Sequence, residues 1–206
     1  MKKILCILIF FLVSIPIYAS EKIVYLLKTG VDLPSVRVWG NSSHLQYVRG
    51  VLPKAEPEVQ YNFALGLAMQ NELETATAAF AEFLQINEGH PRMADALFWI
   101  GRILFLREDF EFSALTFAEF NAFYPEDARV VDTTMWIAEA VARFATANHA
   151  CAVYAALTNF LEEPPDRFNK RLRELTDKAN CDSKEIQKSI SKPIPKPAAP
   201  VGIEDI

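Results

Sequence analysis

The sequence predicts an all-α protein, a solenoid of about three helix–turn–helix repeats with a period of 37 residues, closed by a capping helix. Small residues, aromatic residues and other apolar residues each recur at this one spacing. The recurring sets are Ala76, Ser113 and Ala150; Phe80, Phe117 and Tyr154; Phe83, Phe120 and Leu157; and Ala64, Gly101 and Ala138. The tetrapeptide Phe-Ala-Glu-Phe also occurs twice, at 80–83 and 117–120. A fixed period of this length is typical of stacked supersecondary units.

The first 19 residues are predicted to be a secretory signal peptide. Lys2 and Lys3 form a positive start, Ile4 to Val13 are apolar, and Ala19 offers a small residue for cleavage. The apolar run is too short for a comfortable membrane span, although an uncleaved anchor is the alternative. We therefore expect export to the periplasm, cleavage near Ala19 and no stable membrane span afterwards.

Residues 20–57 do not follow the period and are predicted to form an irregular N-terminal segment. Glycines and prolines divide the stretch into short pieces. Residues 36–39 and 45–48 fit two short strands across the turn at 40–43, which would make a small hairpin.

The domain at 58–181 is expected to contain the helical repeats. In the second unit, the periodicity predicts one helix from about Arg92 to Leu106 and another from about Glu111 to Phe123. The polar turn 107–109 is short enough to join antiparallel neighbours. Small side chains such as Gly101 would let the two helices approach closely.

The segment from about Pro165 to Ala179 is predicted to be the capping helix, since it pairs a few apolar residues with a strongly charged face. If it returns antiparallel to the preceding helix, Cys181 comes back toward Cys151. After loss of Cys6 with the leader these two form an even pair in an oxidising compartment, which favours a disulfide. The alternative is two unlinked buried thiols. Residues 182–206 are rich in proline and lysine and are predicted to form a flexible tail.

The composition argues against several classes of function. The formal net charge is −5, so no basic face for nucleic acid is expected. His44, His90 and His149 are scattered without metal-ligand spacing, and no catalytic or phosphate-binding motif occurs. The sequence therefore predicts a binding protein with no enzyme activity, no cofactor and no metal.

The sequence resembles a known family at residues 96–101, at the helix break 124–125 and at residues 150–154. It is similar there to the C-terminal tetratricopeptide-repeat (TPR) domain of the Tol–Pal-associated YbgF/CpoB proteins, the cell division coordinators. The resemblance covers about residues 58–181. It implies a periplasmic protein that associates with TolA or a septal peptidoglycan synthase and coordinates outer-membrane constriction with peptidoglycan synthesis. Family members usually carry an N-terminal coiled coil that trimerises, but residues 20–57 show no heptads, so the oligomeric state stays open.

In a TPR stack the first helices of the units line a concave groove for a peptide. The repeat register assigns ten residues to this groove: Tyr61, Leu65, Met69, Asp95, Phe98, Arg102, Phe105, Met135, Glu139 and Arg143. Arg102 and Arg143 are the expected anchors for a carboxylate. For the apolar members, ordinary packing in the core is the favoured explanation. Two other functions remain as alternatives, an envelope assembly factor of the outer-membrane protein insertion type and a glycan-binding accessory protein of an envelope enzyme.

Overall fold

A computed structural model describes residues 23, 26, 27 and 49–181 of the 206-residue chain. The predicted signal peptide, the possible hairpin and the tail lie outside these described residues. Residues 23, 26 and 27, in the stretch expected to be irregular, are helical. Within the described part, no helix is both long and apolar enough to cross a membrane.

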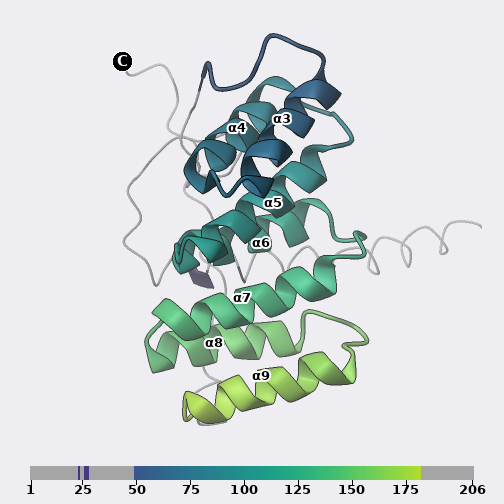
Figure 1. Cartoon of the computed structure of the whole chain (residues 1–206). Coiled ribbons are helices and arrows are strands. Elements are labelled where there is room, and N and C mark those ends of the chain that lie inside the picture. Colours follow the sequence, from purple (N-terminus) through teal and green to yellow (C-terminus); the bar gives the residue numbers. More distant parts are fainter. Residues whose placement is uncertain (1–22, 24–25, 28–48, 182–206) are drawn as a thin grey trace, which may run out of the picture.

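The described chain folds into α-helices that follow one another from one end of the molecule to the other (Figure 1). They are α3 (Pro57–Met69), α4 (Leu73–Ile86), α5 (Met93–Leu106), α6 (Phe110–Phe123), α7 (Val130–Phe144), α8 (Ala147–Thr158) and α9 (Asp166–Lys178). Each helix packs on the next one in the chain, and α9 packs on both α7 and α8. The prediction of an all-α protein built from consecutive helices is confirmed, and the helices expected in the second unit and at the C-terminal end all form.

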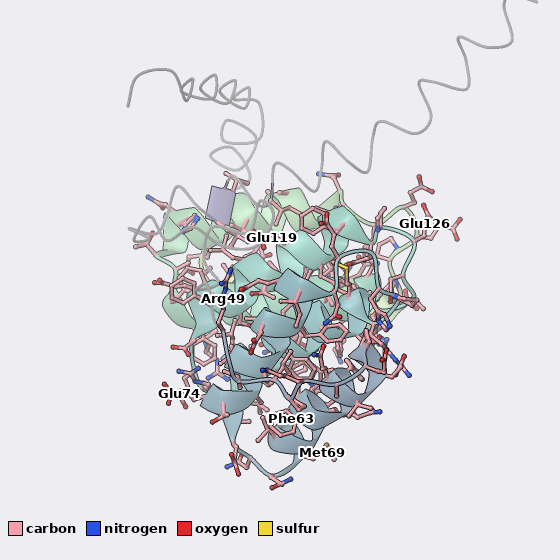
Figure 2. All side chains as sticks on the ribbon, turned by 90° about the horizontal axis from the view of Figure 1, so that it is seen from above. Arg49, Phe63, Met69, Glu74, Glu119 and Glu126 are labelled. Carbon is pink, nitrogen blue, oxygen red and sulfur yellow. A yellow bond between two sulfur atoms is a disulfide. The ribbon has the colours of Figure 1, made fainter. Side chains whose placement is uncertain are left out.

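We call α3, α5 and α7 the A helices and α4, α6 and α8 the B helices. The helices run back and forth across the stack, so that Glu74 at the start of α4 and Glu126 before α7 lie at opposite ends of the helices (Figure 2). The short turns inside the first two units are alike. Asn71 and Glu108, one period apart, both have a φ of 64°. In each turn the next amide bonds back to a carbonyl five residues earlier, from Glu72 to Leu67 and from Asp109 to Leu104, which is the Schellman way of ending a helix.

The small residues of the repeat act as expected at the contact between α5 and α6. Gly101 lies directly against the Phe117 ring. Ser113 Oγ donates a buried hydrogen bond of 2.9 Å to the Gly101 carbonyl oxygen. These two contacts hold the pair of helices at close range.

The core forms two adjoining clusters of buried side chains. One gathers residues of α3, α4 and α5, such as Tyr61 and Phe80, together with Phe120 of α6 and Val130 of α7. The other gathers residues of α6 to α9 together with Ile23 and Leu27. A part of the chain that precedes the helix stack therefore contributes to the core of its C-terminal half.

Candidate functional site

A ladder of ion pairs joins each A helix to the helix two places later. Its acidic members are spaced by 37 residues and lie in the first turns of α3, α5 and α7, and its arginines lie at the starts of α5, α7 and α9. The pairs are Glu58–Arg92 at 3.2 Å, Asp95–Arg129 at 2.8 Å and Asp132–Arg167 at 3.0 Å. Exposed pairs of this kind contribute at most about 1 kcal/mol each. Their repetition shows that the start of α9 lies beside the start of α7, as the starts of α5 and α7 lie beside those of α3 and α5.

Arg129 is the most firmly held arginine of the ladder. Its guanidinium binds both carboxylate oxygens of Asp127 and also Asp95, at 2.7 to 2.8 Å. It also covers the rings of Phe98 and Phe120, 4.9 and 5.1 Å from their centres. The hydrogen bonds from Arg129 lower the pKa of Asp127, and the same bonds raise the pKa of Arg129.

Asp95, one of the residues assigned to the groove, forms ion pairs with two arginines of the same chain. It accepts a hydrogen bond of 3.0 Å from Arg92 in addition to the one from Arg129. Glu139 is likewise bound by Arg171, whose pKa it raises. A cationic partner could therefore bind either carboxylate only by replacing an arginine of the same chain.

Arg102 differs from the ladder arginines because it lies among aromatic rings. Its guanidinium is 5.8 Å from the centre of the Trp99 ring and 5.6 Å from that of Trp136. The side chain is half-buried, and across residues 49–181 no carboxylate lies within ion-pair distance of it. A guanidinium stacked on aromatic faces is held in place yet keeps its hydrogen-bond donors for another group.

Arg143 occupies a similar setting at the end of the same aromatic network. Phe105 contacts Trp136 at 4.6 Å and Phe110 at 5.1 Å between ring centres, and Arg143 covers Phe110 at 5.4 Å. Contacts therefore run without a break from one predicted anchor to the other. We call the connected group the arginine–aromatic patch: Trp99, Arg102, Phe105, Phe110, Trp136 and Arg143.

The structure brings only some of the ten predicted groove residues into this patch, namely Arg102, Phe105 and Arg143. Tyr61 is buried beneath Arg92, and burial raises its pKa. Phe98 lies beneath Arg129 as described above, and Leu65 and Met135 are half-buried against the two core clusters. Met69 is 75% exposed on α3, in the first unit.

Sequence reasoning missed Trp99, Trp136 and Phe110 as members of a site. The two tryptophans are one period apart, and this regularity was visible in the sequence. Trp99 lies near Arg102 because both belong to α5, three residues apart, whereas the proximity of Trp136 to Arg102 depends on contact between α5 and α7, which single-helix patterns do not show. Trp136 packs on Phe105 of α5, so it belongs to the contact between two units.

The predicted disulfide between Cys151 and Cys181 is present, with 5.4 Å between the two Cα atoms. The bond joins Cys151 in α8 to Cys181, which lies three residues after the end of α9. In the described ranges no group of three or more histidine, cysteine or acidic side chains is placed to hold a metal ion. His149 instead donates a hydrogen bond of 2.6 Å from Nε2 to the Leu26 carbonyl oxygen.

In comparisons with known proteins, no family model, no curated protein and no solved structure matches the chain.

Proposed function

We propose that this chain is an exported adaptor with a TPR-like solenoid fold that binds a carboxylate-bearing segment of another envelope protein on its A-helix face. The single observation that carries the proposal is the arginine–aromatic patch. Arg102 and Arg143 keep their donors for a ligand, whereas Arg92, Arg129, Arg167 and Arg171 are ion-paired within the chain. In this proposal the protein has no catalytic site of its own.

The fold part of the proposal is supported by the repeated geometry of the units. The same type of turn joins the two helices of the first unit and the two helices of the second. Equivalent ion pairs link successive A helices. The disulfide supports the export part, since such bonds persist in oxidising compartments. The resemblance to the cell division coordinators makes TolA or a septal peptidoglycan synthase the partner to test first.

The chemistry of the patch favours a peptide over a glycan. Glycan sites present free aromatic faces beside carboxylates, but here Arg102 lies over the faces of both Trp99 and Trp136. A guanidinium fork matches a carboxylate, such as an acidic side chain or a chain terminus. A charge-assisted hydrogen bond in such a setting contributes about 1.5–3 kcal/mol, which is roughly a ten- to hundredfold change in affinity.

The proposal is tested by capture from detergent-solubilised envelope, followed by mass spectrometry and titration of the captured partner. Arg102→Glu should weaken binding of TolA or the synthase by at least about tenfold while leaving the helical content unchanged. Arg173→Glu is the matched control, because Arg173 is an exposed arginine of α9 outside the patch and should leave binding unchanged. Equal binding by wild type and Arg102→Glu would remove the patch from the proposal, and capture of outer-membrane insertion components or glycan alone would remove the proposed partner class.

A further inference from the structure

The C-terminal ends of the A helices carry one position that is exposed in all three units but changes in chemistry. Met69 ends α3, Leu106 ends α5, and Arg143 is the last residue but one of α7, each one period after the one before. We call these three residues the helix-end row. Figure 2, which looks along the stack, shows Met69 and Glu119, a residue of the B helix α6, toward opposite sides of the molecule. The row therefore belongs to the A-helix face.

The two apolar members of the row are the most exposed large apolar side chains in the part of the chain that the structure describes. Met69 is 75% exposed and Leu106 is 60% exposed. A cation in the last turn of a helix complements the helix dipole, as Arg143 does for α7, but α3 and α5 have no basic residue there. Single exposed apolar residues are common, whereas the same position exposed in successive units indicates a binding surface.

The helix-end row adjoins the arginine–aromatic patch. Arg143 belongs to both, Leu106 follows Phe105 in the chain, and Arg102 lies one helical turn before Leu106. Within residues 49–181 neither Arg102 nor Arg143 has a carboxylate at ion-pair distance. The surface therefore runs from an apolar first unit to a cationic third unit, and an acidic group of a ligand is matched only at the cationic end.

The spacing of the row selects the conformation of a ligand that contacts all three residues. Packed helices lie about 8–10 Å apart, and the ring contact of 4.6 Å between Phe105 and Trp136 shows that α5 and α7 touch. A polyproline II helix rises about 3.1 Å per residue and presents every third residue on the same face, so facing residues are about 9.3 Å apart. The facing residues of a β-strand are about 6.7 Å apart, and those one turn apart on an α-helix are about 6 Å apart. Only the polyproline II spacing matches one step of the stack.

We propose that the helix-end row binds a polyproline II segment of a partner protein in which two apolar residues and one acidic residue follow one another at every third position. The apolar side chains contact Met69 and Leu106. The carboxylate lies at α7, where Arg143 and the Arg102 guanidinium that covers Trp136 supply the donors. Aromatic side chains beside the row favour such a ligand, because proline-rich segments dock on aromatic-lined grooves. This inference rests on the proposed function, since it names the ligand class of the same site.

Fluorescence anisotropy of labelled synthetic peptides with the purified protein tests the ligand class. The probe is Leu-Pro-Pro-Leu-Pro-Pro-Glu with an amidated C-terminus, made in both chain directions so that the tighter form is used. It should bind at least about tenfold more tightly than the same peptide with glutamine in place of glutamate. It should also bind at least about fivefold more tightly than Leu-Leu-Pro-Pro-Pro-Pro-Glu, which has the same composition but a displaced central leucine.

Leu106→Ala tests the register of the ligand, because Leu106 is exposed and its truncation leaves the core unchanged. This variant should weaken binding of the probe by at least about fivefold, but it should have little effect on a probe whose central leucine is alanine. Ile86→Ala is the matched control. Ile86 is 53% exposed at the end of the B helix α4, so its truncation should leave both affinities unchanged.

Three results would overturn the inference, and they are distinguishable from a failure of the proposed function. Equal binding of the probe and its rearranged form would remove the three-residue spacing, and weaker binding of the glutamine form would then leave carboxylate recognition standing. Unchanged affinity of Leu106→Ala for the probe would remove the helix-end row. Absence of binding by the wild-type protein up to about 1 mM would remove the ligand class, whereas capture of the envelope partner with Arg102→Glu decides the proposed function separately.

Discussion

Gly101→Ala should destabilise the protein, although alanine stands at the equivalent position in both other units. A Cβ atom on Gly101 would lie 2.7 Å from Cε1 and 2.9 Å from Cδ1 of Phe117. Ordinary carbon contacts are about 3.5–4.0 Å, so either the ring or the helix must move. The ring has little room to move because it packs against Phe98 and Trp136, and the bond from Ser113 to Gly101 opposes separation of α5 from α6.

The net effect is the difference between two opposing terms. Alanine is favoured over glycine inside a helix by about 1 kcal/mol. Overpacking a filled core costs about 1–3 kcal/mol, and the confined ring places this site in the upper part of that range. We therefore expect the free energy of unfolding to fall by about 1–2 kcal/mol. For a chain of this size the midpoint of thermal unfolding should then fall by roughly 3–6 °C.

Urea unfolding followed by circular dichroism measures the change, with Gly66→Ala as the matched control. Gly66 also lies inside a helix, but a Cβ atom there would meet only Gln70 Nε2, at 3.9 Å. That variant should be more stable by about 0.5–1 kcal/mol, which reports the helix propensity alone. In a Phe117→Leu background, Gly101→Ala should become neutral or stabilising. If Gly101→Ala is as stable as wild type with Phe117 present, the reasoning about this contact is refuted.

Three further predictions concern stability. Reduction of the Cys151–Cys181 bond, which closes a loop with a sequence separation of 30, should lower the free energy of unfolding by about 3–4 kcal/mol, and the double serine variant should show the same loss with no further effect of reductant. Because Arg129 lowers the pKa of Asp127, this ion pair stabilises the fold at pH values above 3.8, the ordinary pKa of aspartate. The stabilisation is lost as the pH falls through the lowered pKa. Thermal unfolding between pH 2 and 6 should therefore depend less on pH in Asp127→Asn. Burial raises the pKa of Tyr154 from 10.0 to about 12, so the folded state should lose stability as the pH rises from 10 to 12, and Tyr154→Phe should reduce that loss in a spectroscopically monitored alkaline titration.

The helices were predictable because their determinants are local and periodic. The bounds of α5 and α6 followed from the spacing of apolar residues and from the polar turn that contains Glu108. The disulfide was predictable because the sequence predicts that Cys6 is removed with the leader, which would leave two cysteines, and because the last helix returns along the stack.

The ion-pair ladder and the patch were harder to predict because they depend on contacts between units. The acidic ladder residues have the period of the repeat, but Arg167 departs from it by one position relative to Arg92 and Arg129. A search for exact periodicity therefore misses the third pair. The repeat register assigned Phe98 to the groove, but the neighbouring Trp99 is the residue that contacts Arg102. Neighbouring residues lie about 100° apart around a helix axis, and the Phe98 and Trp99 side chains are both half-buried, so the register does not separate them. Helix α6 has apolar residues on all faces, a pattern that indicates burial without revealing what covers it.

The two ends of the helix stack differ in a way that limits self-assembly. A row of similar units has ends with similar packing geometry, so copies could add head to tail and grow into filaments. The first helix, α3, exposes Val59 and Phe63 at 54% and 40%. The last helix, α9, exposes Lys170, Arg173 and Glu174 around its three buried apolar residues. Docking α3 of one copy onto α9 of another would remove the exposed Lys170 and Arg173 from water, so the charged surface of α9 disfavours head-to-tail addition of a second copy.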